Sequence, residues 1–268
     1  MEKKYKIGVC GSSGMVGGAM LRYFQRKPNY TTYFYDVKGA GSLEELNHAN
    51  FIYMCVPTPH VPGIGCDTSI LEDAVSKITG QKVIIIKSTV TPGTTRKLQK
   101  EFPQHKFLFS PEFLTEVTAD NDMCYPDRQI IGYTEESYTV AKDVLQQLPL
   151  APFERIVKAD EAEMIKYFGN NWFAVKVVFA NQMYDLCQKL NIDYEVVKDG
   201  AAADKRIGRT HLDIFHKGGR GAGGKCLRKD LAATVELSDK IGNPLPLLKI
   251  AQELNDSLLL NFGKEKYV

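Results

Sequence analysis

Hydrophobic and polar residues alternate in blocks along the first 150 residues, where short apolar runs are separated by amphipathic stretches. The apolar runs predict strands at Tyr5–Cys10, Thr32–Tyr35, Phe51–Cys55, Val83–Ile86, Phe107–Phe109 and Gln129–Ile131. Helical spacing predicts helices at Met15–Arg26, Ser69–Ile78, Thr94–Glu101 and Glu135–Leu148. Nearly continuous apolar strands separated by helices indicate a parallel sheet covered on both faces. Right-handed crossovers then give a doubly wound, Rossmann-like α/β fold.

The pattern changes near residue 158. From Ala159 to about Leu190 there is no proline, and apolar residues recur at helical spacing. Such a helix is roughly 48 Å long, too long for a crossover in the sheet. Asp193–Ala202 and Pro244–Leu260 predict further helices, separated by a glycine-rich loop. We therefore expect a Rossmann domain at 1–157 and an all-α domain at 158–268 that begins with a long connecting helix.

Composition is that of an ordinary globular protein. The chain has 268 residues, 44% of them hydrophobic and 25% charged, and a net charge of +2. This balance gives no reason to expect a nucleic acid partner. No signal region and no bilayer-spanning apolar window is present, so we expect a cytoplasmic protein without membrane attachment. The six cysteines lack CxxC pairs, which disfavours a metal site or a disulfide framework and predicts mostly buried, inert thiols.

The strongest local signal is the segment from Tyr5 to Gly17, YKIGVCGSSGMVG, which predicts a strand, a glycine turn and a helix start. Glycine permits the tight turn and the close approach of a pyrophosphate, and N–H groups at the helix start hold its charge. Asp36 ends the next predicted strand, where its carboxylate would accept hydrogen bonds from the ribose hydroxyls. These features predict a dinucleotide cofactor.

The carboxylate of Asp36 favours NAD, because it would repel the 2′-phosphate of NADP, while Lys38 just beyond it keeps NADP as an alternative. The GxxGxxG spacing is one residue longer than GxGxxG, so we expect a slight bulge in the loop. The candidate cofactor contacts are Gly11, Ser13, Gly14, Met15, Val16, Gly17, Asp36, Val56, Pro57, Thr58 and Thr89.

Four further segments carry candidate chemistry: VPTP at 56–59, KSTV at 87–90, SPEFLTE at 110–116 and GAGGKCLRKD at 221–230. The first three follow predicted strands, at the carboxyl edge of the sheet where ligands bind. Lys166 and Asn170 lie one turn apart on the long helix. Cys226 stands among glycine and cationic residues, including Lys225, which favours a thiolate nucleophile over a buried thiol.

Taken together, these motifs resemble the UDP-glucose/GDP-mannose dehydrogenases, and the resemblance runs in order from residue 5 to about residue 256. It implies an NAD-dependent oxidation of a nucleotide-sugar C6 alcohol to a carboxylate in two hydride transfers. Cys226 would attack the intermediate aldehyde to give a thiohemiacetal, which is oxidised to a thioester and hydrolysed.

The resemblance also implies roles for other residues. Lys166 and Asn170 would stabilise the developing oxyanion, and Asp230 would assist proton transfer. Glu116 and Thr89 would hold the hydrolytic water, with Glu112 on the same loop. Arg206 would reach a neighbouring subunit. The candidate catalytic residues are Thr89, Glu112, Glu116, Lys166, Asn170, Cys226 and Asp230, and the candidate substrate contacts are Arg206, Gly223, Gly224 and Lys229.

The sequence also departs from this family. We expect a shortened form without the C-terminal nucleotide-sugar-binding domain. Ala222 replaces an aromatic residue of the glycine loop, and Arg228 replaces a proline. Two alternatives stay open: a single-step dehydrogenase of the 3-hydroxyacid or 6-phosphogluconate type, and a non-catalytic NAD-binding remnant that acts as an assembly partner. The apolar length of the long helix predicts a homodimer through the helical domain.

Overall fold

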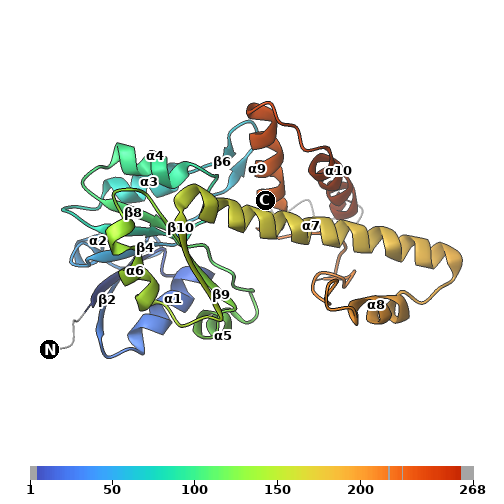
Figure 1. Cartoon of the computed structure of the whole chain (residues 1–268), viewed down its shortest axis with the longest axis horizontal. Coiled ribbons are helices and arrows are strands. Elements are labelled where there is room, and N and C mark those ends of the chain that lie inside the picture. Colours follow the sequence, from blue (N-terminus) through green and yellow to red (C-terminus); the bar gives the residue numbers. More distant parts are fainter. Residues whose placement is uncertain (1–4, 217, 225, 261–268) are drawn as a thin grey trace. The chain divides into compact units, whose positions relative to one another are not determined.

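The computed structural model describes residues 5–216, 218–224 and 226–260, and the chain divides into two compact units (Figure 1). The first unit comprises Met1–Pro59 and Asp67–Lys166, and the second comprises His60–Cys66 and Tyr167–Val268. Helix α7 (Ala159–Leu190) begins in the first unit and continues through the second.

An eight-stranded sheet forms the centre of the first unit, in the order β10-β9-β8-β7-β4-β1-β2-β3. Its strands are β1 (Tyr5–Cys10), β2 (Tyr30–Asp36), β3 (Ala40–Gly41), β4 (Phe51–Met54), β7 (Val83–Ile86), β8 (Lys106–Phe109), β9 (Arg128–Tyr133) and β10 (Phe153–Lys158). The helices of this unit are α1 (Met15–Gln25), α2 (Leu43–Leu46), α3 (Ser69–Ser76), α4 (Thr94–Glu101), α5 (Ala119–Cys124), α6 (Tyr138–Gln147) and the start of α7.

Alternate residues of each central strand face two separate hydrophobic cores. Ile84 and Ile86 of β7 lie in a core closed by α2, α3 and α4, whereas Ile85 lies in a core closed by α1, α5 and α6. A strand buried on both faces carries apolar residues at every position, which is why VIII appears without polar interruption. The three-layer, Rossmann-like fold that the sequence predicts is confirmed.

The sheet is not wholly parallel, and the edge distant from β1 differs from the expectation. β9 runs antiparallel to β8, with Leu108 beside Tyr133, and β10 runs parallel to β9 with Lys158 beside Tyr133. The sequence analysis missed β10, because its edge position leaves it only partly buried and its pattern, FERIVK, lacks a continuous apolar run. The direction in which a strand runs does not change its pattern of apolar residues, so the antiparallel direction of β9 could not be predicted from that pattern.

The start of α7 packs closely on β9 at a glycine. A Cβ atom on Gly132 would lie 2.7 Å from the Cβ of Ala162 and 2.9 Å from the Cα of Ala159. The absence of a side chain at this position therefore allows the helix to rest on the strand backbone.

One turn further along α7, Glu163 binds the N-terminus of α4. Its carboxylate accepts hydrogen bonds from the backbone N–H of Gly93 at 2.6 Å and of Thr95 at 2.8 Å, and from the Thr95 hydroxyl at 2.6 Å. It thus satisfies N–H groups that have no partner within their own helix. Glu163 is fully buried, and burial raises its pKa to about 7 although these hydrogen bonds favour the charged form.

The second unit consists of helices and one small hairpin. Its elements are β5 (His60–Val61), β6 (Gly65–Cys66), the remainder of α7, α8 (Tyr194–Ala202), α9 (Leu227–Lys240) and α10 (Pro246–Leu260). The hairpin is held on α9 by the ion pair of His60 with Glu236 at 2.9 Å and by Lys240, whose Nζ donates to the Ile64 carbonyl at 2.8 Å. Neither the hairpin nor α9 was predicted from the sequence, because α9 follows a glycine-rich loop directly and begins with the charged run LRKD.

Two kinds of feature are missing from the residues at 5–216, 218–224 and 226–260. None of their helices is sufficiently long and apolar to cross a bilayer. No group of three or more histidine, cysteine, aspartate or glutamate side chains is arranged there to hold a metal ion.

Glu163→Gln is expected to remove a pH-dependent part of the stability. The folded pKa of about 7 lies above the ordinary value of 4.5, so the carboxyl favours the native state below pH 4.5 and this contribution is lost as pH rises through 7. Relative to the variant, the free energy of unfolding of the unchanged protein should fall by roughly 3 kcal/mol over this range. Urea denaturation at a series of pH values measures it.

Asp160→Asn is the matched control. Asp160 forms an exposed ion pair with Arg96 at 3.0 Å, so it joins the same two helices without burial. Its charge makes the smallest contribution to the raised pKa of Glu163, so its loss should leave most of the pH dependence in place. If the free energy of unfolding varied with pH in the same way in the unchanged protein and in Glu163→Gln, the role of the buried carboxyl would be contradicted.

Candidate functional site

The glycine turn after β1 has the backbone geometry of a phosphate loop. Gly11 has a φ of +85°, and a Cβ there would lie 2.5 Å from the Cys55 carbonyl oxygen; a Cβ on Gly17 would lie 2.1 Å from the Gly11 carbonyl oxygen. Both positions therefore require glycine. Gly14 precedes α1, and Ser13, Met15 and Val16 complete the turn and helix start, so free helical N–H groups are available for a pyrophosphate.

Asp36 at the end of β2 is bound to this turn. Its carboxylate accepts from the backbone N–H of Ser13 at 3.0 Å and of Lys38 at 2.9 Å. Burial by itself would raise the pKa of Asp36, but these hydrogen bonds hold it below its ordinary value. The side chain is thus an anion next to the glycine turn, which fits the ribose hydroxyls of a dinucleotide.

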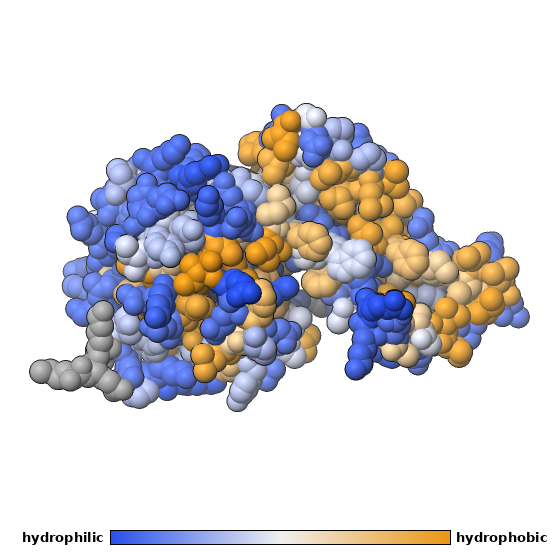
Figure 2. Space-filling view, viewed as in Figure 1, coloured by the Kyte–Doolittle hydropathy of each residue, from blue (hydrophilic) through white to orange (hydrophobic). Residues whose placement is uncertain are grey.

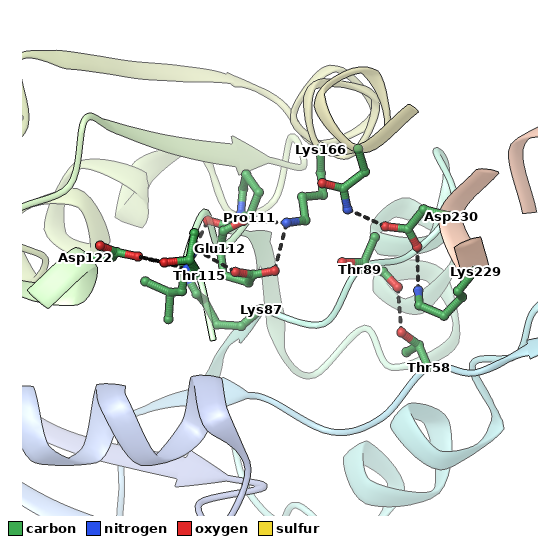
Figure 3. Close-up of polar contacts among 12 residues, drawn as sticks. Thr58, Lys87, Thr89, Pro111, Glu112, Thr115, Asp122, Lys166, Lys229 and Asp230 are labelled. Atoms are coloured by element: carbon green, nitrogen blue, oxygen red, sulfur yellow. Dashed lines mark hydrogen bonds and ion pairs between the residues drawn. The ribbon is translucent and has the colours of Figure 1, made fainter. Parts of the chain in front are cut away.

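The VPTP and KSTV segments follow the neighbouring parallel strands β4 and β7 and are joined by hydrogen bonds. The Thr58 hydroxyl donates to the Thr89 carbonyl at 2.6 Å (Figure 3), and the Ser88 hydroxyl donates to the Val56 carbonyl at 2.6 Å. Val56, Pro57, Thr58 and Thr89 therefore lie together at the carboxyl edge of the sheet, as the sequence predicts for residues after parallel strands.

A buried ion pair joins the SPEF segment to α7. Lys166 Nζ donates to Glu112 Oε1 at 2.7 Å and to the Glu112 carbonyl at 2.8 Å (Figure 3), and the two side chains are 8% and 10% exposed. Burial by itself would raise the pKa of Glu112, but the charge and hydrogen bond of Lys166 hold it below its ordinary value. Glu112 is therefore a carboxylate paired with Lys166.

A second buried lysine lies close to this pair, and the sequence analysis did not single it out. Lys87, at the end of β7, donates to the Ser110 hydroxyl and the Pro111 carbonyl, both at 3.2 Å. Burial lowers its pKa to about 8. Lys87 also contributes to the lowered pKa of Glu112, so two cations surround one carboxylate.

The second unit holds another polar cluster on α7 and α9. Asp230 is fully buried, and its carboxylate accepts from Asn170 Nδ2 at 2.5 Å and from Lys229 Nζ at 2.6 Å. The sequence analysis expected Asn170 to stabilise the developing oxyanion and Lys229 to contact the substrate. In the structure both bind Asp230, which positions them and places a carboxylate beside two donors.

Cys226 immediately precedes α9, and its carbonyl accepts the backbone N–H of Asp230 at 3.0 Å as the first hydrogen bond of the helix. Of the six cysteines, all of which the structure describes, Cys226 is the exposed one. Burial raises the pKa of Cys10 to about 11 and that of Cys55 to about 12, so these two are inert thiols. Negative charge is stabilised at a helix N-terminus, where Cys226 lies; its neighbour Lys225 is outside the described residues.

Other candidate residues lie on the surface. The Arg206 side chain is 91% exposed and pairs with Asp204 at 2.6 Å. Gly223 and Gly224 are exposed in the loop before Cys226, and Glu116 is exposed after the SPEF segment. Their assigned roles stay predictions.

Sequence reasoning missed Lys87, Glu163 and Asn255, three buried polar residues of the two units. Each acts on backbone or side-chain groups distant in sequence, so no local spacing reveals it. A local signal exists only for Lys87, a charged residue directly after the apolar run VIII of β7; Asn255 lies among other polar residues of α10.

Models of one known protein family match segments of both units. Residues 37–148 match the NAD binding domain of the UDP-glucose/GDP-mannose dehydrogenase family, and residues 160–257 match its central domain. Together these two matches span most of the chain.

Individual proteins agree with this result. The UDP-glucose 6-dehydrogenase TuaD of Bacillus subtilis is 32% identical over 222 residues, which are 79% of this chain and 47% of that protein. The chain spans about half the length of the curated relatives it matches. The solved structure of a UDP-glucose dehydrogenase from Pyrobaculum islandicum superposes with a TM-score of 0.83 at 25% identity, covering 96% of this chain and 69% of that one.

A second class shares the fold. The 3-hydroxyisobutyrate dehydrogenase of Mycobacterium tuberculosis superposes with a TM-score of 0.75 at 14% identity, covering 97% of this chain and 95% of that one. At that identity the likeness concerns the fold alone.

Asp36→Asn is expected to narrow the preference for NAD over NADP. It keeps an oxygen that can accept from the Ser13 N–H but removes the charge that repels a 2′-phosphate, so NADP should bind about tenfold more tightly relative to NAD. Calorimetric titration with both dinucleotides measures the ratio.

Lys38→Ala provides the comparison, because Lys38 is the exposed neighbour that would hold a 2′-phosphate. If the unchanged protein bound NADP as tightly as NAD and Lys38→Ala abolished that binding, the preference assigned to Asp36 would be wrong.

Removing either partner of the buried Lys166–Glu112 pair is expected to destabilise the protein by about 3–5 kcal/mol. Glu112→Leu should cost more than Lys166→Met, because it leaves two buried ammonium groups near one another, whereas Lys87 still balances Glu112 when Lys166 is removed. The double variant should cost less than the sum of the single variants. Urea denaturation at neutral pH gives the three values.

The exposed pair of Arg22 with Asp120, with side chains about half exposed, is the control. Asp120→Asn should change the free energy of unfolding by less than about 1 kcal/mol. Additive effects at Lys166 and Glu112 would show that the two side chains do not stabilise one another.

Proposed function

Since the chain belongs to the UDP-glucose/GDP-mannose dehydrogenase family, we propose that it oxidises the C6 alcohol of a nucleotide sugar to a carboxylate, with Cys226 as the nucleophile. The observation that carries the proposal is the position of Cys226. It is the exposed thiol among six, directly before a helix whose first turn contributes the buried carboxylate of Asp230. Cysteine is the side chain able to form a thioester.

NAD, when bound, accepts the hydrides. The alcohol loses a hydride from C6 and a proton from its oxygen, which gives an aldehyde. The Cys226 thiolate adds to the aldehyde carbon to give a thiohemiacetal, and loss of a second hydride and the hydroxyl proton gives a thioester. Water then attacks the thioester carbon, the carbon–sulfur bond breaks, and the products are the carboxylate and the Cys226 thiol.

The polar residues supply electrostatic and proton-transfer functions for these steps. Lys166 provides a cation for the oxygen that becomes negative at each stage, a contribution of several kcal/mol in typical sites. The Glu112 carboxylate holds its ammonium in one orientation. Asn170 is oriented by Asp230, whose carboxylate is suited to accept a proton or to position water.

A single-step dehydrogenase is the competing function, and the fold likeness to a 3-hydroxyisobutyrate dehydrogenase is compatible with it. That chemistry transfers one hydride and needs no nucleophilic thiol. An exposed cysteine at a helix start, next to Asp230, is unnecessary in such an enzyme. Cys226 therefore favours the two-step reaction.

A homodimer through the second unit is part of the proposal. Apolar residues of α7 recur at intervals of four or seven and form one stripe along the helix, and they remain exposed in a single chain. They are Phe168, Trp172, Phe179, Leu186 and Leu190, with 49–74% exposure. Hydrophobic residues gather on the visible face of this unit (Figure 2). A second copy related by two-fold symmetry would cover such a stripe.

The stoichiometry of NADH tests the reaction. UDP-glucose, GDP-mannose and UDP-N-acetyl hexosamines should be offered in limiting amount, and two NADH per sugar oxidised are expected from the unchanged protein. Cys226→Ser should stop near one, because a serine hydroxyl is hardly ionised at neutral pH. One NADH per sugar from the unchanged protein would favour the single-step enzyme, and NAD binding without any NADH would favour the non-catalytic remnant.

Light scattering tests the assembly. The unchanged chain is expected at twice the 30.0 kDa of one copy, and Phe179→Asp should give the single copy because it places a charge in the covered stripe. Leu150→Asp, which changes an exposed apolar residue of the first unit, should leave the dimer unchanged. A single copy at micromolar concentration for the unchanged chain would contradict the proposal.

A further inference from the structure

The loop that carries Cys226 is bound to α10 by a side chain that is almost fully buried. Asn255, 1% exposed, accepts the backbone N–H of Ala222 at 2.6 Å with Oδ1 and donates to the Ala222 carbonyl at 3.2 Å with Nδ2. One amide group thus satisfies both backbone groups of one residue, as a neighbouring strand would. The loop is thereby fixed four residues before Cys226.

The residue before Ala222 is shaped for this contact. Gly221 has a φ of +86°, and a Cβ there would lie 3.2 Å from Asn255 Oδ1 and 3.2 Å from the Cβ of Leu258. Both the backbone conformation and the space at this position favour glycine. The close approach of the loop to α10 is therefore built into its sequence.

The adjacent residue of α10 binds the other side of Cys226. Asp256 accepts from Arg228 Nε at 2.9 Å, and both side chains are about one-third exposed. Arg228 lies in the first turn of α9, two residues after Cys226. Neighbouring residues of one helix therefore hold the chain on both sides of the thiol.

We infer that Asn255 and Asp256 are positioning residues for Cys226, which clamp the glycine-rich loop and the first turn of α9 to α10. The inference rests on the proposed function of Cys226 as nucleophile. Five glycines between 218 and 224 are described in this loop, and glycine loses more conformational freedom on ordering than other residues. A nucleophile must be held to about 0.5 Å, so the loop needs an external anchor.

The clamp also involves two positions at which the sequence departs from the family motif. Ala222 and Arg228 are the positions at which the loop departs from the motif that it resembles, and they are the two residues that α10 binds. Ala222 is buried against the helix, and Arg228 supplies a charge where a proline would supply none. The two departures from the motif therefore coincide with the hydrogen-bonded contacts of this segment with α10.

Alkylation of Cys226 tests the clamp without requiring turnover. Iodoacetamide labelling at neutral pH, quantified at Cys226 by mass spectrometry, should slow about three- to tenfold in Asn255→Ala, because a displaced thiol loses the stabilisation of its thiolate at the start of α9. Asn255→Asp keeps the acceptor for the Ala222 N–H and should give an intermediate rate. Asp256→Asn should slow labelling about twofold.

Glu253→Ala, which changes an exposed residue of the same helix, is the matched control and should label at the unchanged rate. Each variant is studied well below its melting temperature, and Asn255→Asp with Asp256→Asn carry the test if Asn255→Ala does not fold. In turnover, the clamp variants should lower kcat while KM for NAD is unchanged. A labelling rate that is unchanged or faster in the clamp variants overturns the inference.

The two conclusions fail separately. If the unchanged protein turns over no nucleotide sugar but labelling slows in the clamp variants, the proposed function is wrong and the clamp stands. If turnover gives two NADH per sugar and labelling does not respond, the clamp is wrong and the reaction stands.

Discussion

Two carboxylates fix the beginning of α7 within the first unit, and the placement of its chemistry depends on them. Glu163 binds the N-terminus of α4, and three residues later Lys166 binds Glu112. The two contacts lie about one turn apart, so together they set both the rotation and the height of the helix. A helix held by apolar contacts alone can slide or rotate at low cost, whereas charged hydrogen bonds have direction.

Burying these charges is costly, and the structure shows how the cost is limited. Glu112 meets Lys166 directly and Lys87 at longer range. Asp230 meets Asn170 and Lys229. Glu112 and Asp230 each have at least one cation near them, which offsets desolvation without removing it, whereas Glu163 meets only backbone and hydroxyl donors. Lys87 donates to the neutral acceptors Ser110 and Pro111, and burial lowers its pKa to about 8.

The sequence predicted those parts of the fold that local patterns determine. The bounds of β1, β7 and α7 agree with the prediction, because each has a continuous apolar run or a long helical period. The antiparallel direction of β9 depends on pairing between distant segments and leaves no periodic signal. α9 was missed because its start is polar. Of the candidate site, the motifs located Glu112, Lys166 and Asp230, but the partner of each side chain follows from packing that no spacing encodes.

The reversed β9–β10 pair determines where α7 starts. Because Lys158 lies beside Tyr133, and Tyr133 beside Leu108, the helix leaves the sheet at the level of the body of β8. Roughly 10 Å of helix, at about 1.5 Å per residue, then carries Lys166 towards the segment after β8 where Glu112 lies. Gly132 fixes the position at which this stretch of helix begins, because the helix packs directly on its Cα. The absence of a Cβ at Gly132 thus brings α7 into direct contact with the backbone of β9. This contact determines how deeply Lys166 is inserted.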